Sequence, residues 1–252
     1  GTSLDGIEVA LIAFDLDDSG VECGLPTLVA HAHTPYSAEL RDKVLAICQG
    51  QLLSMPQLGW VDIEVARQYV SAVTQLLAQV GMQAAQISAV GAHGQTVVHQ
   101  PTGTHPFTLQ LGDGNTMAVG TVIPTVTDFR RRDMALGGQG APLACIFHEQ
   151  MFRHPSETRV VLNLGGIANV TILAPQAPTW GFDTGPANIL MDAWIHRHQG
   201  LLYDAQGAWA ASGQVDEALL HAMLQEPYFQ VAAPKSTGRE LFNAAWLDSL
   251  LS

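Results

Sequence analysis

Asp183 is the side chain of this sequence best suited to act as a general base. It lies in Gly-Phe-Asp-Thr-Gly-Pro, residues 181–186, where a predicted strand ends and Pro186 opens a helix predicted over residues 187–198. The positive end of that helix would favour the ionised carboxylate that a general base requires. The competing interpretation is that Asp183 only caps the helix.

Two glycine-bounded turns have the character of phosphate-binding loops. Gly165-Gly166 joins the apolar runs 160–164 and 167–173, which predicts strand, tight turn and strand. A second turn, residues 1–6 (GTSLDG), precedes the apolar run 7–15, and adjacent glycines expose amides that an anion can approach. Taken alone, the turn at residues 1–6 could be an ordinary Ser- and Asp-rich turn. Neither loop matches a P-loop or a Rossmann fingerprint.

Further polar motifs follow predicted strands: HGQT at 93–96, DFRRRD at 128–133 and an Asn at 188. Function gathers where strands end in open α/β sheets, which favours these motifs as a group. Each also has a plain structural interpretation as a core histidine, a solvated turn or a capping residue. Asp5 and Asp113 compete with Asp183 for a base or metal role. The pair His31 and His33 shares one face of a predicted strand but has no visible third metal ligand.

The composition argues for a globular protein with a sizeable core. The chain has 252 residues, 47% of them hydrophobic, and a net charge of −12. The acidic balance disfavours binding to nucleic acid or to anionic membranes. No run approaches transmembrane length, and Cys23, Cys48 and Cys145 have no metal-ligand spacing. We therefore expect a cytoplasmic protein with buried thiols.

Strands that alternate with helices predict an α/β fold. The expected strands are a hairpin within 1–17 and runs at 29–34, 87–92, 107–111 and 119–126, followed by the central hairpin. The expected helices are 37–49, 61–80, 142–152, 187–198 and 215–225, and a final helix after a capping box at 237–240. The chain begins inside a motif and ends in a helix without a stop signal, so we interpret it as a fragment.

Six motifs together resemble the anhydro-N-acetylmuramic acid kinase family. They are GTSLDGIEVAL, GAHGQTVVH, TVTDFRRRDMALGGQGAPL, LNLGGIANVTIL, GFDTGPANILMDAW and PKSTGRELFN, in order along essentially the whole chain. The resemblance implies a sugar kinase/Hsp70/actin-like (ribonuclease H-like) two-lobe fold, incomplete in this chain. The expected parts are an N-terminal lobe over 1–135 and the start of a truncated second lobe over 136–252.

The resemblance also implies a reaction. Members use ATP and magnesium to phosphorylate O6 of 1,6-anhydro-N-acetylmuramic acid while water opens the anhydro bridge, which gives N-acetylmuramic acid 6-phosphate in bacterial peptidoglycan recycling. Family chains extend beyond both ends of this sequence, which puts activity of the fragment alone in question. The full-length protein is expected to be a homodimer.

The family's functional residues map onto this sequence by motif. Asp183 matches the catalytic aspartate and activates the attacking water. The ATP-binding positions are Gly1, Thr2, Ser3, Leu4, Asp5, Gly6, Ile7, Glu8, Gly165 and Gly166. The sugar contacts are His93, Thr96, Arg130 and Asn188. Magnesium is expected to be held mainly by ATP and water, with Asp5 as a further ligand.

Some assignments stay open on the sequence. Arg130 suits the lactyl carboxylate of the sugar, with Arg131 and Arg132 as competitors. The segment 234–240 (PKSTGRE) has no firm role. Two other functions are weighed against the kinase: a non-catalytic sugar- or nucleotide-binding module on the same fold, and a glycoside hydrolase that works without ATP.

Overall fold

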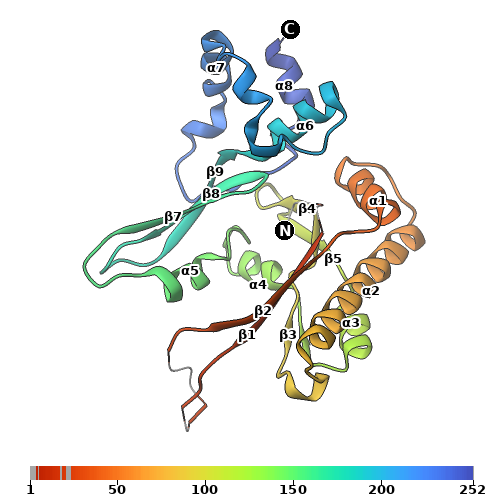
Figure 1. Cartoon of the computed structure of the whole chain (residues 1–252). Helices are drawn as coiled ribbons and strands as arrows, with labels where there is room; N and C mark the ends of the chain where they lie inside the picture. The colour runs from red at the N-terminus through yellow and green to blue at the C-terminus, as the bar shows by residue number, and fades with distance from the viewer. Residues whose placement is uncertain (1–3, 5, 18, 21–23, 252) are drawn as a thin grey trace. The chain divides into compact units, whose positions relative to one another are not determined.

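The computed structural model describes residues 4, 6–17, 19–20 and 24–251. The chain divides into two compact units, residues 1–140 and 141–252, and each is described by itself. Both contain helices and small sheets (Figure 1), so the predicted α/β class is confirmed. The identity of these units with the two expected lobes stays a prediction.

The first unit begins with a long antiparallel strand pair. Strand β1 (Ile7–Ala13) pairs with β2 (Thr27–Thr34), with Ile7 opposite Thr34. The expected hairpin within residues 1–17 is therefore wrong, because the apolar run forms one strand without an internal turn. Between the two strands, Asp17 accepts hydrogen bonds from Ser19 and Gly20. The strand expected at 29–34 is confirmed as part of β2.

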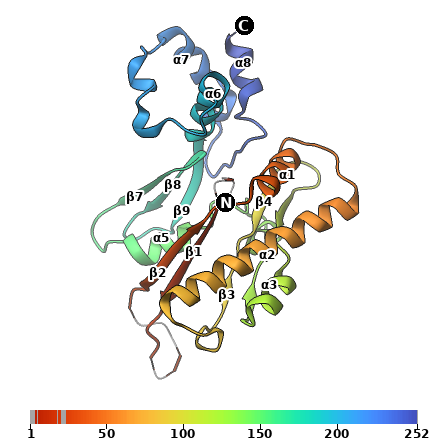
Figure 2. The same ribbon diagram turned by 45° about the vertical axis from the view of Figure 1, so that its right-hand side comes forward.

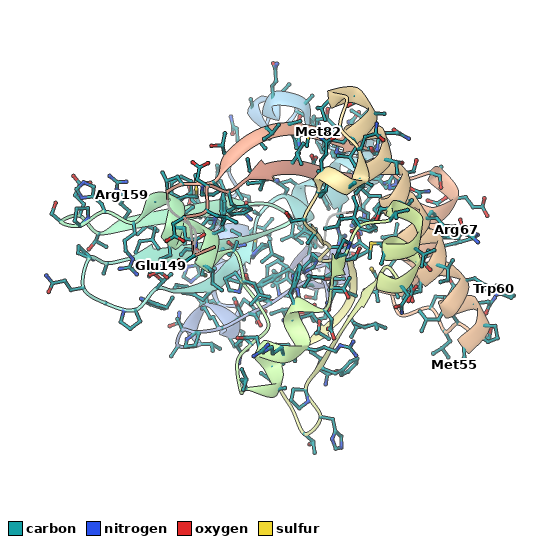
Figure 3. All side chains as sticks on the ribbon, turned by 90° about the horizontal axis from the view of Figure 1, so that it is seen from below. Met55, Trp60, Arg67, Met82, Glu149 and Arg159 are labelled. Atoms are coloured by element: carbon teal, nitrogen blue, oxygen red, sulfur yellow. The ribbon has the colours of Figure 1, made fainter. Side chains whose placement is uncertain are left out.

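Helix α2 is the longest element of the first unit and packs against β1, β2, α1 (Ala38–Cys48) and α3 (Gly114–Thr121). Figures 1 and 2 show it alongside the β1–β2 pair. It spans Met55–Val80 and starts six residues before the predicted residue 61. Ser54 and Gln57 form a capping box that fixes this start, and Gly81 ends the helix in the left-handed conformation. Met55 and Trp60 project from the exposed first turns (Figure 3).

The other elements of the first unit are short. The helices are α1 (Ala38–Cys48), α3 (Gly114–Thr121), α4 (Phe129–Ala135) and the 3₁₀ turn η1 (Ala84–Gln86). Parallel strands β3 (Val90–Gly91) and β6 (Thr125–Val126) pair, and β4 (Gln95–Gln100) pairs antiparallel with β5 (Phe107–Leu111). The helix expected at 37–49 and the strand at 107–111 are confirmed, whereas the strand at 87–92 shrinks to β3.

The strand expected at 119–126 is wrong. Asp113 caps α3 by accepting from the Thr116 amide at 2.6 Å, and the helix continues through Thr121. Only the two residues of β6 are extended. The helix that Asp113 caps is therefore favoured over the strand that the β-branched residues of this stretch would prefer.

One hydrophobic core joins β1, α1, α2, β4 and β5 of the first unit. Its fully or nearly buried members come from β1, α1, α2, β4 and β5 and include Ile7, Val44, Val65, Val97 and Leu111. Leu4, just before β1, belongs to the same core. The apolar stripe of α2 thus fixes the strands that carry the site residues of this unit.

The second unit is built on a three-stranded antiparallel sheet, β7 (Arg159–Leu164), β8 (Ile167–Leu173) and β9 (Trp180–Pro186). The predicted strand–turn–strand around Gly165-Gly166 is confirmed, with Leu164 opposite Ala168. Helix α5 (Cys145–Phe152) contacts β8. It begins three residues after the expected Pro142. Cys145 and Cys48 are half-buried rather than buried as expected.

Helices α6 (Asn188–Gln199), α7 (Glu217–Leu224) and α8 (Ala244–Leu251) gather beyond one end of this sheet (Figures 1 and 2). The 3₁₀ turns η2 (Ala205–Gly207), η3 (Ala210–Ser212) and η4 (Pro227–Gln230) connect them. Phe242 is fully buried here, with ring centroids of Tyr228, Phe229 and Trp246 within 5.8 Å. Because α8 begins at Ala244, the expected capping box at 237–240 does not start it.

None of the helices in the described part of the chain is long and apolar enough to cross a membrane.

Candidate active site

Asp183 lies inside strand β9, opposite Asn169 of β8, and its side chain is buried. The strand continues through Pro186, and α6 starts at Asn188. The residue before α6 is Ala187, which makes no side-chain capping bond. The interpretation of Asp183 as a cap for this helix is therefore wrong, and so is the expectation that Pro186 starts the helix, because Pro186 ends β9.

The surroundings of Asp183 come from a segment about 50 residues later in the chain. Its carboxylate Oδ2 accepts a hydrogen bond from the Thr237 amide at 3.1 Å. Its own amide donates to the Lys235 carbonyl at 3.0 Å, and its carbonyl accepts from the Tyr228 hydroxyl at 2.6 Å. Backbone and side chain of Asp183 are thus both fixed, as a preorganised base requires.

Lys235 secures that segment. Its Nζ donates to the carbonyls of Tyr228 at 2.9 Å and Phe229 at 3.3 Å, and lies 4.5 Å from the centroid of the Tyr228 ring. Burial, together with the charges of Asp183 and Glu240, raises the pKa of Tyr228, so its hydroxyl stays a donor at neutral pH. The segment 234–240, whose role the sequence left open, therefore holds the best base candidate in place.

The Gly165-Gly166 turn is bonded to the start of α6. The carbonyl of Gly165 accepts from the Asn188 amide at 2.9 Å, and that of Gly166 accepts from Ala187 at 2.9 Å and Ile189 at 3.1 Å. The Asn188 side chain donates through Nδ2 to the Leu164 carbonyl at 3.3 Å. The structure thus brings three predicted site residues, Gly165, Gly166 and Asn188, together.

The fold itself does not require glycine at this turn. A Cβ added at Gly165 or Gly166 would meet no atom closer than 3.6 Å, and neither residue has a positive φ. Gly6 differs, because a Cβ there would come within 2.6 Å of the Thr34 carbonyl oxygen across the β1–β2 pair. The glycines of the turn are thus left without a structural explanation in their own unit, whereas Gly6 has one.

The first unit brings His93 and Arg130 together. Arg130 Nε donates to His93 Nε2 at 2.7 Å, and His93 Nδ1 lies 2.8 Å from the Gly94 carbonyl, to which it donates. Burial, aided by the charge of Arg130, lowers the pKa of His93 to about 4. The imidazole is therefore neutral at pH 7, and its one acceptor nitrogen orients the guanidinium.

Thr96 has a different setting. Its side chain is buried in β4, where Oγ1 accepts from the Gln110 amide group at 3.2 Å. Gln110 also donates to Thr108 at 2.7 Å, so Thr96 belongs to a polar ladder between β4 and β5.

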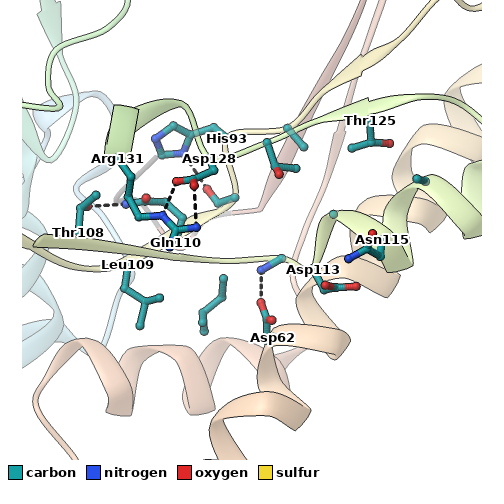
Figure 4. A pocket seen from close by; sticks show the side chains of 17 residues that line it. Asp62, His93, Thr108, Leu109, Gln110, Asp113, Asn115, Thr125, Asp128 and Arg131 are labelled. Carbon is teal, nitrogen blue, oxygen red and sulfur yellow. Dashed lines mark hydrogen bonds and ion pairs between the residues drawn. The ribbon is translucent and has the colours of Figure 1, made fainter. Parts of the chain in front are cut away.

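A polar pocket of about 400 Å³ lies beside this ladder. His93 lines it, and so do Asp128 and Arg131, which form an ion pair at 2.6 Å (Figure 4). Neither Thr96 nor Arg130 lines this pocket. Its lining does include four residues that were not predicted as site residues: Asp62, Gln110, Asn115 and Thr127. The sequence gives no sign that Asp62 lines a pocket, because it lies in an amphipathic helix. Its carboxylate accepts a hydrogen bond from the Gly112 amide at 2.6 Å, a contact between residues far apart in the sequence.

Of the two rival aspartates, Asp113 has a structural partner, and Asp5 lies outside the described residues. Asp113 caps α3, and hydrogen bonds from Thr116 lower its pKa. Glu8 accepts from His33 at 2.6 Å and also bonds to His31, so the two histidines do share a face. Burial raises the pKa of Glu8, but hydrogen bonds from His33 and His31 outweigh it and the pKa is lowered. Among the described residues, no three His, Cys, Asp or Glu side chains gather in a way that could hold a metal ion.

The predicted N-terminal ATP loop is only partly within the described residues. Gly1, Thr2, Ser3 and Asp5 lie outside them. Leu4 and Ile7 are core residues, and Glu8 is exposed on β1 beside the two histidines.

Comparison with known proteins decides the family. The model of the family described as anhydro-N-acetylmuramic acid kinase matches residues 1–252. The chain belongs to the anhydro-N-acetylmuramic acid kinase family. This membership confirms the sugar kinase/Hsp70/actin-like fold class expected from the sequence.

Curated relatives named anhydro-N-acetylmuramic acid kinase agree. Those of Vibrio vulnificus strains YJ016 and CMCP6 are each 51% identical over 251 residues. That of Vibrio parahaemolyticus serotype O3:K6 (strain RIMD 2210633) is 50% identical over 252 residues. The matches cover 100% of this chain but 66% of each relative, just under two thirds of their length.

Proposed function

We propose that the full-length protein uses ATP to phosphorylate O6 of 1,6-anhydro-N-acetylmuramic acid while water opens the anhydro ring. The product is N-acetylmuramic acid 6-phosphate, an intermediate of peptidoglycan recycling. The observation that carries this proposal is the match of the family model to the whole chain, residues 1–252, with a buried and hydrogen-bonded Asp183 in its predicted motif.

Asp183 is the proposed general base. It takes a proton from water as the water oxygen bonds to the anomeric carbon, and the bond from that carbon to O6 breaks. O6 then bonds to the γ-phosphorus of ATP, ADP leaves, and Asp183 later releases the proton to solvent. Hydrogen bonds from Thr237 and to Lys235 fix the carboxylate and its backbone for this step, which is what positioning contributes to phosphoryl transfer.

Gly165 and Gly166 are proposed to contact the phosphates of ATP. The supporting observation is that their own unit leaves room for a Cβ at both positions. A ligand that approaches the backbone closely would give the reason for glycine that the fold does not. Residues Gly1, Thr2, Ser3, Leu4, Asp5, Gly6, Ile7 and Glu8 are proposed as the other ATP loop, within which Gly6 also serves strand pairing.

His93, Thr96, Arg130 and Asn188 are proposed as sugar contacts. Arg130 is proposed to bind the lactyl carboxylate, with Arg131 and Arg132 as competitors. The neutral His93 orients the Arg130 guanidinium, which suits bidentate binding of a carboxylate. Thr96 and Asn188 contribute through hydroxyl and amide groups that also bond within the protein.

Magnesium is proposed to arrive with ATP, held by phosphate oxygens and water, with Asp5 as a further ligand. Its chemistry would be to neutralise charge on the phosphates during transfer. We further propose a cytoplasmic homodimer that binds no nucleic acid, in keeping with the net charge of −12.

Mass spectrometry of the reaction tests the proposal. The full-length protein is incubated with ATP, magnesium and the anhydro sugar, and N-acetylglucosamine serves as the control acceptor. The expected product has gained one phosphoryl group and one water, and the control sugar stays unmodified. Recovery of the anhydro sugar unchanged would refute the kinase function.

A further inference from the structure

Thr237 has a buried hydroxyl beside the carboxylate of Asp183. The residue is 9% exposed, and its amide donates to Asp183 Oδ2 at 3.1 Å. Its Oγ1 has no hydrogen-bond partner among the described residues. A buried hydroxyl without a partner is destabilising, so such a group calls for a functional explanation.

The backbone around Thr237 is fixed relative to Asp183. Two residues earlier, the Lys235 carbonyl accepts from the Asp183 amide at 3.0 Å, and the Lys235 ammonium is bonded to the carbonyls of η4. The segment 235–237 therefore runs beside β9, held at both the main chain and the side chain. The hydroxyl of Thr237 is carried on a single rotatable side-chain bond and can exchange between staggered positions while the backbone stays in place.

We propose that Thr237 is the positioning residue of Asp183, with its amide and its hydroxyl both donating to the carboxylate in the substrate-bound enzyme. This inference rests on the proposed role of Asp183 as a general base. Two donors on one side of the carboxylate orient the remaining lone pairs toward the water. They also favour the ionised form, which keeps the base active at lower pH.

Replacement of the hydroxyl by a methyl group tests the inference. In the full-length protein, Thr237→Val keeps the side-chain size and the amide. We expect kcat to fall about tenfold with KM for the sugar within about twofold, since a positioned base acts in the transition state. The acid limb of the kcat profile, which reports the substrate-bound enzyme, should move up by about one pH unit. Thr237→Ser, which restores the hydroxyl, should recover both values.

The outcomes separate this inference from the proposed function. A Thr237→Val enzyme with the kcat and acid limb of the unaltered protein overturns the inference alone, as does a Thr237→Ser variant as impaired as Thr237→Val. An unaltered protein that forms no product overturns the proposed function and the inference with it.

Two further variants guard against a folding artefact. Thr121→Val removes another buried hydroxyl, which donates to the Met117 carbonyl in α3, and should leave the acid limb unchanged. Should Thr237→Val not fold, Thr237→Ala carries the same expectation for the acid limb, and an unshifted limb in that variant overturns the inference.

Discussion

Asp183 and the His93–Arg130 pair are held in contrasting ways. Asp183 is fixed largely by backbone groups of a segment about 50 residues away, through the Thr237 amide and the Lys235 carbonyl. Arg130 is oriented by a side chain, the neutral imidazole of His93, at 2.7 Å. Backbone contacts do not titrate, whereas the imidazole does. The comparison teaches that the contacts that hold the proposed base do not depend on pH, whereas the contact that orients Arg130 is lost where His93 becomes protonated.

Removal of the base should have the largest effect. Asp183→Asn keeps the size of the side chain but cannot accept a proton, so we expect kcat to fall by about 10³-fold. The measurement is steady-state ADP release with the anhydro sugar. Asp248→Asn is the matched control, because Asp248 is an exposed partner of Arg197 in a surface ion pair, and it should keep full activity.

Loss of the guanidinium at Arg130 should have the next largest effect. Arg130→Ala should raise KM for the sugar about 10- to 100-fold, as expected for a lost charged hydrogen bond. Initial rates over a range of sugar concentrations measure it. Arg67→Ala removes an exposed arginine paired with Glu64 and should change nothing. A larger effect from Arg131→Ala would transfer the proposed role to Arg131.

A methyl group at the glycine turn should weaken ATP binding with little change in stability. Gly166→Ala should raise KM for ATP about tenfold, because the added methyl group would keep the phosphates from approaching the backbone closely. The added Cβ meets nothing in its own unit closer than 3.8 Å, so the fold should accept it. The variant's midpoint of thermal unfolding should stay near that of the unaltered protein. Gly185→Ala, in contrast, should lower the free energy of unfolding by about 1–3 kcal/mol. At Gly185 φ is 151°, and the added Cβ would lie 2.7 Å from Phe229 Cε1. Equal ATP affinity in both variants would argue against a phosphate contact at the turn.

Loss of the Tyr228 hydroxyl should have a smaller effect on activity. Tyr228→Phe removes the donor to the Asp183 carbonyl at 2.6 Å and should lower the free energy of unfolding by about 1 kcal/mol. A few-fold fall in kcat should accompany it, measured together with chemical denaturation. Tyr203→Phe, at an exposed position, is the control. Loss of kcat with unchanged stability would mean that Tyr228 acts on the reaction more directly.

The pH dependence of stability should have the smallest effect on activity near neutral pH, because both histidines are neutral there. Burial lowers the pKa of both His93 and His99 to about 4, below the value of about 6.5 of an unfolded histidine. The unfolded chain therefore binds more protons between these values, and the stabilisation present above pH 6.5 is lost as the pH falls toward 4. We expect a loss of roughly 1 kcal/mol per histidine between pH 7 and 5, discounted for partial exposure. Denaturation curves at both pH values check this, and His99→Gln should reduce the slope.

Local patterns predicted much of the fold. The apolar runs around Gly165-Gly166 gave the β7–β8 hairpin, because turn and strand signals were adjacent in sequence. The start of α2 at Met55 was missed, although Ser54, Pro56 and Gln57 form a helix-start signature in the sequence. The strand predicted at 119–126 was wrong, because the helix capped by Asp113 extends into this β-branched run.

The candidate site was predictable in its residue types and less so in its contacts. Asp183, Gly165, Gly166 and Asn188 stand in recognisable motifs. The support of Asp183 by Lys235 and Thr237 depends on how two distant segments pack, and hydrogen bonds over 54 residues leave no local pattern. For the same reason the pairing of Asp62 with Gly112 was invisible in the sequence.

The most direct test is the stoichiometry of the reaction with and without ATP in the full-length protein. ADP, N-acetylmuramic acid 6-phosphate and unphosphorylated N-acetylmuramic acid are quantified together over one time course. Ring opening and phosphoryl transfer as one event predict equal amounts of ADP and 6-phosphate, with no ring-opened sugar when ATP is omitted. Unphosphorylated N-acetylmuramic acid formed without ATP would contradict the account and indicate a hydrolase.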